Sequence, residues 1–191
     1  FTLARDTHTR RLCGVVHRVE HLGVKQGHLV CRVHVAPALR ALAQRVDSYI
    51  FQAATVPEIL AVTLAEDFAP FSREYDLAGL ERDYPSREYC VQYRETDLDF
   101  VQRLMAEEGI YYYFDHAGST EKLMLVDHNA ALPALETMDG QPVGIEGPEG
   151  GTTAAETVRH FELAHQTLTT SATVRDFDWT QPRLGLPGKG L

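Results

Sequence analysis

The chain has 191 residues and a formal net charge of −9, from 18 Lys or Arg and 27 Asp or Glu. Hydrophobic residues make up 44% and charged residues 24%, the balance of an ordinary globular protein, which excludes wholesale disorder and a fibrous repeat. No apolar run approaches the roughly 18 residues of a membrane span and no N-terminal signal pattern is present. We therefore expect one domain or two small ones, with no stable membrane insertion.

The charge is unevenly distributed along the chain. Residues 1–45 hold eight Lys or Arg against two acids, a net of +6, whereas the remainder holds 10 basic and 25 acidic residues, a net of −15. The overall acidity excludes a general nucleic-acid binder. Two interpretations of the basic segment stay open: it faces acidic surface elsewhere in its own assembly, or it binds a polyanion.

The cysteines are few and widely spaced. Cys13, Cys31 and Cys90 form neither a disulfide framework nor a zinc pattern, which predicts a reducing, cytoplasmic origin. The sequence does not begin with Met, which favours a fragment or a processed chain.

The first predicted elements are two strands over residues 14–20 and 29–36, joined by a loop that contains Gly23 and Gly27. In the second strand the apolar residues alternate, so that one face carries a row of them: Leu29, Cys31, Val33 and Val35. Pro37 ends this strand, and a short helical stretch is expected over 38–44.

Two helices are predicted next. Thr55 and Glu58 form a capping box with Pro57 between them, and a helix of about three turns follows. Thr96 caps the second helix with Asp99 as its partner, and Gly109 ends it in a left-handed cap. Its apolar stripe comprises Leu98, Val101, Leu104 and Met105, widened by Phe100. We also expect Asp99 and Arg103 to pair one turn apart.

Strands are predicted on both sides of the second helix. Residues 89–93 precede it, and residues 110–114 and 122–126 follow it as a hairpin. Residues 132–156 are rich in Gly and Pro and read as a loop or linker, and strands resume over 158–165 and 172–179. This mixture without regular alternation predicts an α+β fold with antiparallel sheets.

Standard catalytic and cofactor motifs are absent from the sequence, including G-x-S-x-G, H-E-x-x-H, the Walker A loop and G-x-G-x-x-G. We therefore assign no catalytic, cofactor-binding or metal-ligating residue, and we expect the chain not to be an enzyme. Four features resemble sites, but each favours a structural role: His17 with His21 as metal ligands, the acids Glu95, Asp97 and Asp99 as catalytic carboxylates, residues 176–179 as a calcium loop, and the aromatic run 111–114 as a stacking platform. Gly147–Gly151 lacks the Lys and the strand–helix context of a phosphate cradle.

One long motif gives more specific information about the function. Residues 84–114, which read YPSREYCVQYRETDLDFVQRLMAEEGIYYYF, resemble the VgrG family of type VI secretion spike proteins almost without interruption. Further matches are Gly14–Val16, Ser48–Gln52, the helix start at Thr55–Leu60, and Asp176–Asp178 with Pro182. Two positions depart from the family pattern: Tyr49 stands where Arg is usual, and no aromatic follows Pro37.

The resemblance implies a phage tail-hub-like fold with antiparallel β-barrel-like domains and a helix-containing insertion. Residues 1–36 would end the first hub barrel, 37–128 form the α+β insertion, 129–157 a Gly/Pro-rich loop, and 158–191 begin the second barrel. It also implies a structural spike base that trimerises in the full-length protein, docks on a hexameric secreted tube, and contacts baseplate components and effectors. Assembly would be cytoplasmic, followed by secretion through the type VI machine without a signal peptide.

Three alternatives stay open at this stage. A prophage or contractile-phage tail-hub protein shares the same fold. A glycan- or peptidoglycan-acting enzyme would need paired acids or a metal in a cleft. A small binding module would use an exposed Tyr111–Tyr113 strand.

Overall fold

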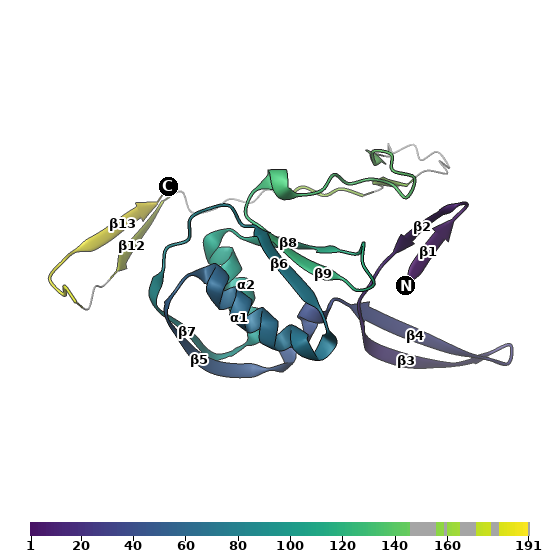
Figure 1. Cartoon of the computed structure of the whole chain (residues 1–191), viewed down its shortest axis with the longest axis horizontal. Helices are drawn as coiled ribbons and strands as arrows, with labels where there is room; N and C mark the ends of the chain where they lie inside the picture. Colours follow the sequence, from purple (N-terminus) through teal and green to yellow (C-terminus); the bar gives the residue numbers. More distant parts are fainter. Residues whose placement is uncertain (146–155, 159, 165–170, 177–179, 191) are drawn as a thin grey trace. The chain divides into compact units, whose positions relative to one another are not determined.

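The computed structural model describes residues 1–145, 156–158, 160–164, 171–176 and 180–190 (Figure 1). The chain divides into two compact units, Phe1–Pro142 and Val143–Leu191. The helices are α1 (Val56–Phe68) and α2 (Asp97–Glu108), with 3₁₀ turns η1 (Ala38–Gln44), η2 (Ala69–Phe71) and η3 (Asn129–Ala131). The strands of the first unit are β1 (Thr2–Arg5), β2 (His8–Arg11), β3 (Val15–Lys25), β4 (His28–Ala36), β5 (Val46–Ala54), β6 (Glu74–Gly79), β7 (Arg87–Thr96), β8 (Tyr111–Asp115) and β9 (Lys122–Val126). Those of the second unit are β10 (Gly144–Ile145), β11 (Thr157–Val158), β12 (Ala172–Asp176) and β13 (Leu186–Gly190).

The core of the first unit forms where α1 and α2 pack between the β5–β7 pair and the β6–β9–β8 sheet (Figure 1). Phe100 of α2 is fully buried and stacks on Phe51 of β5, with ring centroids 5.8 Å apart. The other side chains with no more than 2% exposure include Leu42, Val56, Ile59, Leu60, Leu64, Val101, Leu104, Leu123 and Leu125. The mixed helix-and-strand class is therefore confirmed.

Both predicted helix starts are present. Thr55 and Glu58 form the reciprocal capping box, in which each accepts a backbone N–H of the other. At α2 the Thr96 hydroxyl accepts the backbone N–H of Asp99 at 3.0 Å, and Gly109 ends the helix with φ +65°. A Cβ is strained in that left-handed conformation, which explains glycine at this position.

The predicted hairpin after α2 is also present, but its sheet is mixed. β8 and β9 pair antiparallel from Tyr111–Val126 to Asp115–Lys122. β6 then pairs with β9 in parallel, which the expectation of purely antiparallel sheets missed. A parallel pair needs a long crossover and leaves no hairpin turn in the sequence, so no local signal marked β6.

The start of η1 is held by a buried carboxylate from a distant segment. Glu121 is 2% exposed, and its Oε1 accepts the backbone N–H of Ala38 at 3.0 Å. Its Oε2 lies 2.9 Å from Nε of Arg73. The charge is thus both hydrogen-bonded and paired, the condition under which a buried carboxylate is tolerated.

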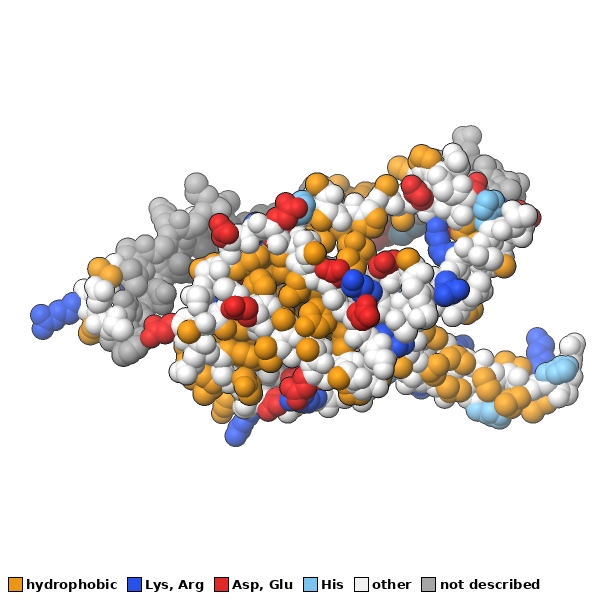
Figure 2. Space-filling view, viewed as in Figure 1, with side chains coloured by type: hydrophobic (Ala, Val, Ile, Leu, Met, Phe, Trp, Pro, Cys, Tyr) orange, Lys and Arg blue, Asp and Glu red, His pale blue; other side chains and the backbone are white. Residues whose placement is uncertain are grey.

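β3 and β4 form a two-stranded antiparallel ribbon with one apolar and one polar face. On the polar face Glu20 is paired with Arg18 at 2.9 Å and with Arg32 at 3.1 Å. The register places Leu29, Val33 and Val35 of the predicted row opposite valines of β3, and Cys31 opposite His21. Six aliphatic residues of this face are 51% to 71% exposed: Val16, Val19, Val24, Leu29, Val33 and Val35. Hydrophobic side chains are visible along the ribbon in Figure 2.

The C-terminal predictions need correction. A strand over 158–165 was expected, but β11 ends at Val158, residues 160–164 form no strand, and residue 165 lies outside the described part. β12 covers the first half of the strand expected over 172–179, and residues 177–179 also lie outside the described part. The β1–β2 hairpin was not expected, because its polar strands show no apolar alternation.

Helix α2 yields a stability prediction with two variants. Thr96→Ala removes one cap hydrogen bond and should lower the free energy of unfolding by about 1 kcal/mol. Leu104→Ala leaves a cavity at a fully buried position and should cost about 2–5 kcal/mol. Urea melts will rank the two, with the exposed Ala106→Ser as a control expected within about 0.5 kcal/mol of the parent. The reverse ranking would show that the buried face of α2 is misassigned.

Candidate functional site

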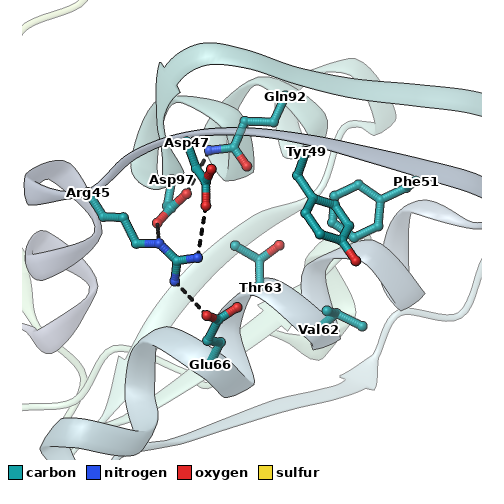
Figure 3. Close-up of a pocket in the computed structure, with 9 residues that line it drawn as sticks. All are labelled: Arg45, Asp47, Tyr49, Phe51, Val62, Thr63, Glu66, Gln92 and Asp97. Carbon is teal, nitrogen blue, oxygen red and sulfur yellow. Dashed lines mark hydrogen bonds and ion pairs between the residues drawn. The ribbon is translucent and has the colours of Figure 1, made fainter.

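A hollow of about 80 Å³ lies between the inner face of β5 and helix α1 (Figure 3). Strand alternation brings Asp47, Tyr49 and Phe51 to one wall, since residues two apart share a face. Helical spacing brings Val62, Thr63 and Glu66 to the opposite wall. Gln92 of β7, Asp97 at the start of α2, and Arg45 complete the lining.

Arg45 lies at the acidic end of this hollow. Its guanidinium is 2.9 Å from Asp47 and 2.9 Å from Glu66, and its Nε is 3.4 Å from Oδ2 of Asp97 (Figure 3). Asp67, just outside the lining, lies 3.4 Å from the same guanidinium. Hydrogen bonds to Asp47 and Glu66 raise the pKa of Arg45 further above its usual value.

Asp97 is the buried member of the group, with 2% exposure. Its backbone N–H donates to the Arg45 carbonyl at 3.1 Å, and its Oδ1 accepts the Gln92 side-chain amide at 2.6 Å. It also lies in the first turn of α2, where the helix dipole favours a negative charge. One carboxylate therefore joins η1–β5, β7 and α2.

Asp67 has a less favourable electrostatic environment than Asp97. Burial, reinforced by repulsion from Asp97, raises the pKa of Asp67 to about 6, and its Oδ2 accepts no hydrogen bond from a described residue. Four carboxylates thus crowd one guanidinium, and the least well paired of them is the one whose charge is disfavoured.

The lining holds three carboxylates, an amide, a threonine and two aromatic rings, but no Ser, Cys or His. Its carboxylates are engaged in ion pairs with Arg45, and Asp97 also accepts the Gln92 amide. In the part of the chain that the structure describes, no three His, Cys, Asp or Glu side chains gather closely enough to hold a metal ion. Nor does any described helix have the length and apolar character needed to cross a membrane.

The three acids around the start of α2 do not all serve the helix terminus. Only Asp99 is the predicted cap partner; its Oδ2 also accepts the Thr96 hydroxyl at 2.7 Å. Glu95 instead lies 2.7 Å from Arg103, which also reaches Glu107 at 3.1 Å. The expected Asp99–Arg103 pair is wrong, because the Thr96 cap holds Asp99 while Arg103 reaches across to β7.

The other weighed features are placed as follows. His17 and His21 lie on β3, and His21 is opposite Cys31 on the ribbon. Tyr112 and Phe114 of the aromatic run pack against the core, which opposes an exposed stacking platform. The Tyr111 hydroxyl donates to Asn129 at 2.8 Å. Gly147–Gly151 lies outside the described residues, as do three of the four residues 176–179.

The sequence reasoning missed Arg45, Gln92 and the hollow itself. Gln92 and Asp97 belong to the motif that carries the resemblance, but their separation of five residues across a strand end gives no periodic signal. A bulge at Arg94, with φ +48°, brings them together by shifting the β5–β7 register by one residue. Val62 of α1 is 56% exposed at the rim of the hollow, which its sequence position does not reveal.

The phage tail baseplate hub family, GPD, matches residues 1–190, and the chain belongs to this family. A comparison with solved structures agrees with a hub-like fold. The E. coli c3393 protein, described as a component of the type VI secretion system with structural similarity to the T4 bacteriophage tail proteins gp27 and gp5, superposes with a TM-score of 0.60. The match covers 94% of this chain and 43% of that one at 22% identity, so it supports the hub-like fold alone.

The chain is also similar in sequence to type VI secretion spike proteins. The chain is 40% identical over 153 residues to the type VI secretion system spike protein VgrG4b of Pseudomonas aeruginosa, which covers 80% of this chain and 18% of the relative. It is 30% identical over 185 residues to the spike protein VgrG3 of Vibrio cholerae, covering 96% and 17%. The actin cross-linking toxin VgrG1 of V. cholerae is 32% identical over 173 residues, covering 91% and 15%. The chain thus spans less than a fifth of the length of these relatives.

The raised pKa of Asp67 predicts how stability depends on pH. The folded state keeps the proton up to about pH 6, whereas the unfolded chain releases it near pH 4, so folded stability should fall as pH rises through this window. Asp67→Asn removes the ionisation and should stabilise the protein by about 1–2 kcal/mol at pH 7.5 and by almost nothing at pH 4. Urea melts at both pH values measure the difference; an Asn variant that is less stable at pH 7.5 would contradict the assignment.

Proposed function

We propose that this chain is part of the base of a type VI secretion spike, a structural hub that assembles as a trimer and docks on the secreted tube. Family membership over residues 1–190 supports a hub, and relatives at 30% to 40% identity that are spike proteins favour the secretion machine over a prophage tail. The protein would assemble in the cytoplasm and leave through the machine. We infer that this region performs no catalysis, although one relative is a toxin.

The observation that carries the proposal is the uncovered apolar face of the β3–β4 ribbon. An isolated two-stranded ribbon is marginal in water, and six aliphatic side chains on one face need a partner surface. A barrel supplies that surface, because its strands turn their apolar sides inward. We therefore propose residues 1–36 as the end of one hub barrel, 37–128 as the inserted α+β region, 129–157 as a connecting loop, and 158–191 as the start of a second barrel.

The polar face of the ribbon fits the same arrangement. It presents Arg18, Arg32 and His34 around a single Glu20, so it is basic, whereas the chain beyond residue 45 is strongly acidic. An exposed basic strip on a barrel exterior would help to set the register against acidic neighbours, mainly through encounter rate and specificity. This role favours the interpretation that the basic N-terminal segment faces acidic surface within its own assembly, and it disfavours a polyanion-binding site.

The apolar face gives the assembly test. In the complete gene product, Val33→Asp places a charge in the proposed barrel interior and should abolish the trimer, because an unpaired buried charge costs several kcal/mol, about enough to unfold a marginal barrel. Arg18→Gln changes the polar face of the same ribbon and should leave the trimer intact. Light scattering coupled to size-exclusion chromatography reports the mass of each.

Two results would oppose the proposal. A parent protein that is stably monomeric would remove the spike base, since a hub must close into a ring. A Val33→Asp variant that stays trimeric would show that the apolar face has no part in the barrel.

A further inference from the structure

The hollow between β5 and α1 contains hydrogen-bond acceptors without donors. Gln92 is 3% exposed, and its side-chain nitrogen donates to Asp97 and to the Glu95 carbonyl. Its amide oxygen points the other way, into the hollow (Figure 3), and accepts from no described residue. Oδ2 of Asp97 is also buried without a hydrogen bond, and its one cationic neighbour among the described residues is Nε of Arg45 at 3.4 Å. Because the Gln92 side chain is buried and its oxygen faces the hollow, a hydrogen-bond donor that enters the hollow would find an acceptor there.

The charge around the hollow specifies the kind of donor. Asp47, Glu66, Asp67 and Asp97 all lie within 3.4 Å of the one guanidinium of Arg45, four negative groups against one positive. Asp67 and Asp97 are the more buried members, whose charges are poorly screened, whereas Asp47 and Glu66 are more exposed to water. A cationic donor is favoured over a neutral one, and an anion is excluded.

The shape of the hollow indicates which kind of cationic group it can accept. Its mouth is lined by Tyr49 and Val62, which are 54% and 56% exposed, and Phe51 lies against Tyr49 with ring centroids 4.7 Å apart. An apolar passage that leads to acceptors suits an aliphatic stem with a charged tip. Tyr49 adds a ring face that attracts a cation.

We propose that this hollow binds a lysine side chain of a partner protein. The four-carbon stem lies between Tyr49 and Val62, and the ammonium donates to Gln92 Oε1 and to the carboxylates of Asp97 and Glu66. An ammonium has three donors and no acceptor, so it can donate to these three acceptors together. A compact ammonium also fits a narrow hollow better than the planar guanidinium of arginine does.

The direct test is an NMR titration of the protein with n-butylammonium chloride as the lysine probe. Saturable shifts are expected for the Gln92 side-chain amide and for the Thr63 and Glu66 backbone amides. The neutral isostere n-butanol and sodium chloride at equal ionic strength should produce none. Methylguanidinium and Ca²⁺ should each bind at least about tenfold more weakly than n-butylammonium.

Four variants connect the binding to the hollow. Glu66→Gln should weaken n-butylammonium binding about tenfold, whereas Glu81→Gln, which removes another largely exposed acid elsewhere, should change it less than twofold. Tyr49→Lys supplies the ammonium from within the chain and should abolish binding while raising the melting temperature. Tyr49→Phe keeps the aromatic wall and should bind as the parent does.

Three results would overturn the proposal. Equal effects of Glu66→Gln and Glu81→Gln would reduce the binding to the general acidity of the chain. Tighter binding of methylguanidinium or Ca²⁺ would assign the hollow to a different cation, and equal shifts with n-butanol would make it an apolar site. None of these measurements depends on the oligomeric state, so they can fail while the proposed spike base stands.

Discussion

The buried carboxylate of Asp97 is the interaction on which the arrangement of the first unit depends. It is 2% exposed and lies in the first turn of α2, and its partners are Gln92 from β7 and Arg45, which directly precedes β5. Removing one partner of such a group leaves an uncompensated charge in the interior, which is strongly destabilising. The helix start, the bulge at Arg94 and the β5–β7 register are therefore fixed together.

Arg45 then determines what the neighbouring hollow can do. It neutralises Asp97, but it is shared with three further acids, so the local charge stays negative and Asp67 is pushed toward its protonated form. The same interaction that stabilises the helix start leaves acceptors and negative charge beside an aromatic wall. Stability and a cation preference here have one physical origin.

The β3–β4 ribbon represents the opposite situation, in which burial within the chain is incomplete. Its polar face is satisfied internally around Glu20, while its apolar face is exposed. The α+β core is well packed and holds its own shape. In the proposed hub, the uncovered ribbon would complete its fold against a neighbouring surface.

The sequence predicted the elements that are specified locally. Caps at Thr55, Thr96 and Gly109 satisfy helix termini with nearby atoms, and alternation in β4 reports directly on its two faces. Strand β6 escaped prediction because its parallel partner is distant in sequence. The hollow was not predicted for a related reason. Its residues Arg45, Gln92 and Asp97 come together only after β5, β7 and α2 have packed, and no spacing in the sequence indicates this.

The central claim is that the apolar face of the β3–β4 ribbon is covered when the protein assembles. Hydrogen–deuterium exchange in this 191-residue chain and in the complete assembled protein tests it directly. The account predicts that the amides of β3 and β4 exchange rapidly in the chain alone and become strongly protected on assembly, while those of β5 and β7 change little. Rapid exchange of β3 and β4 in both would contradict it.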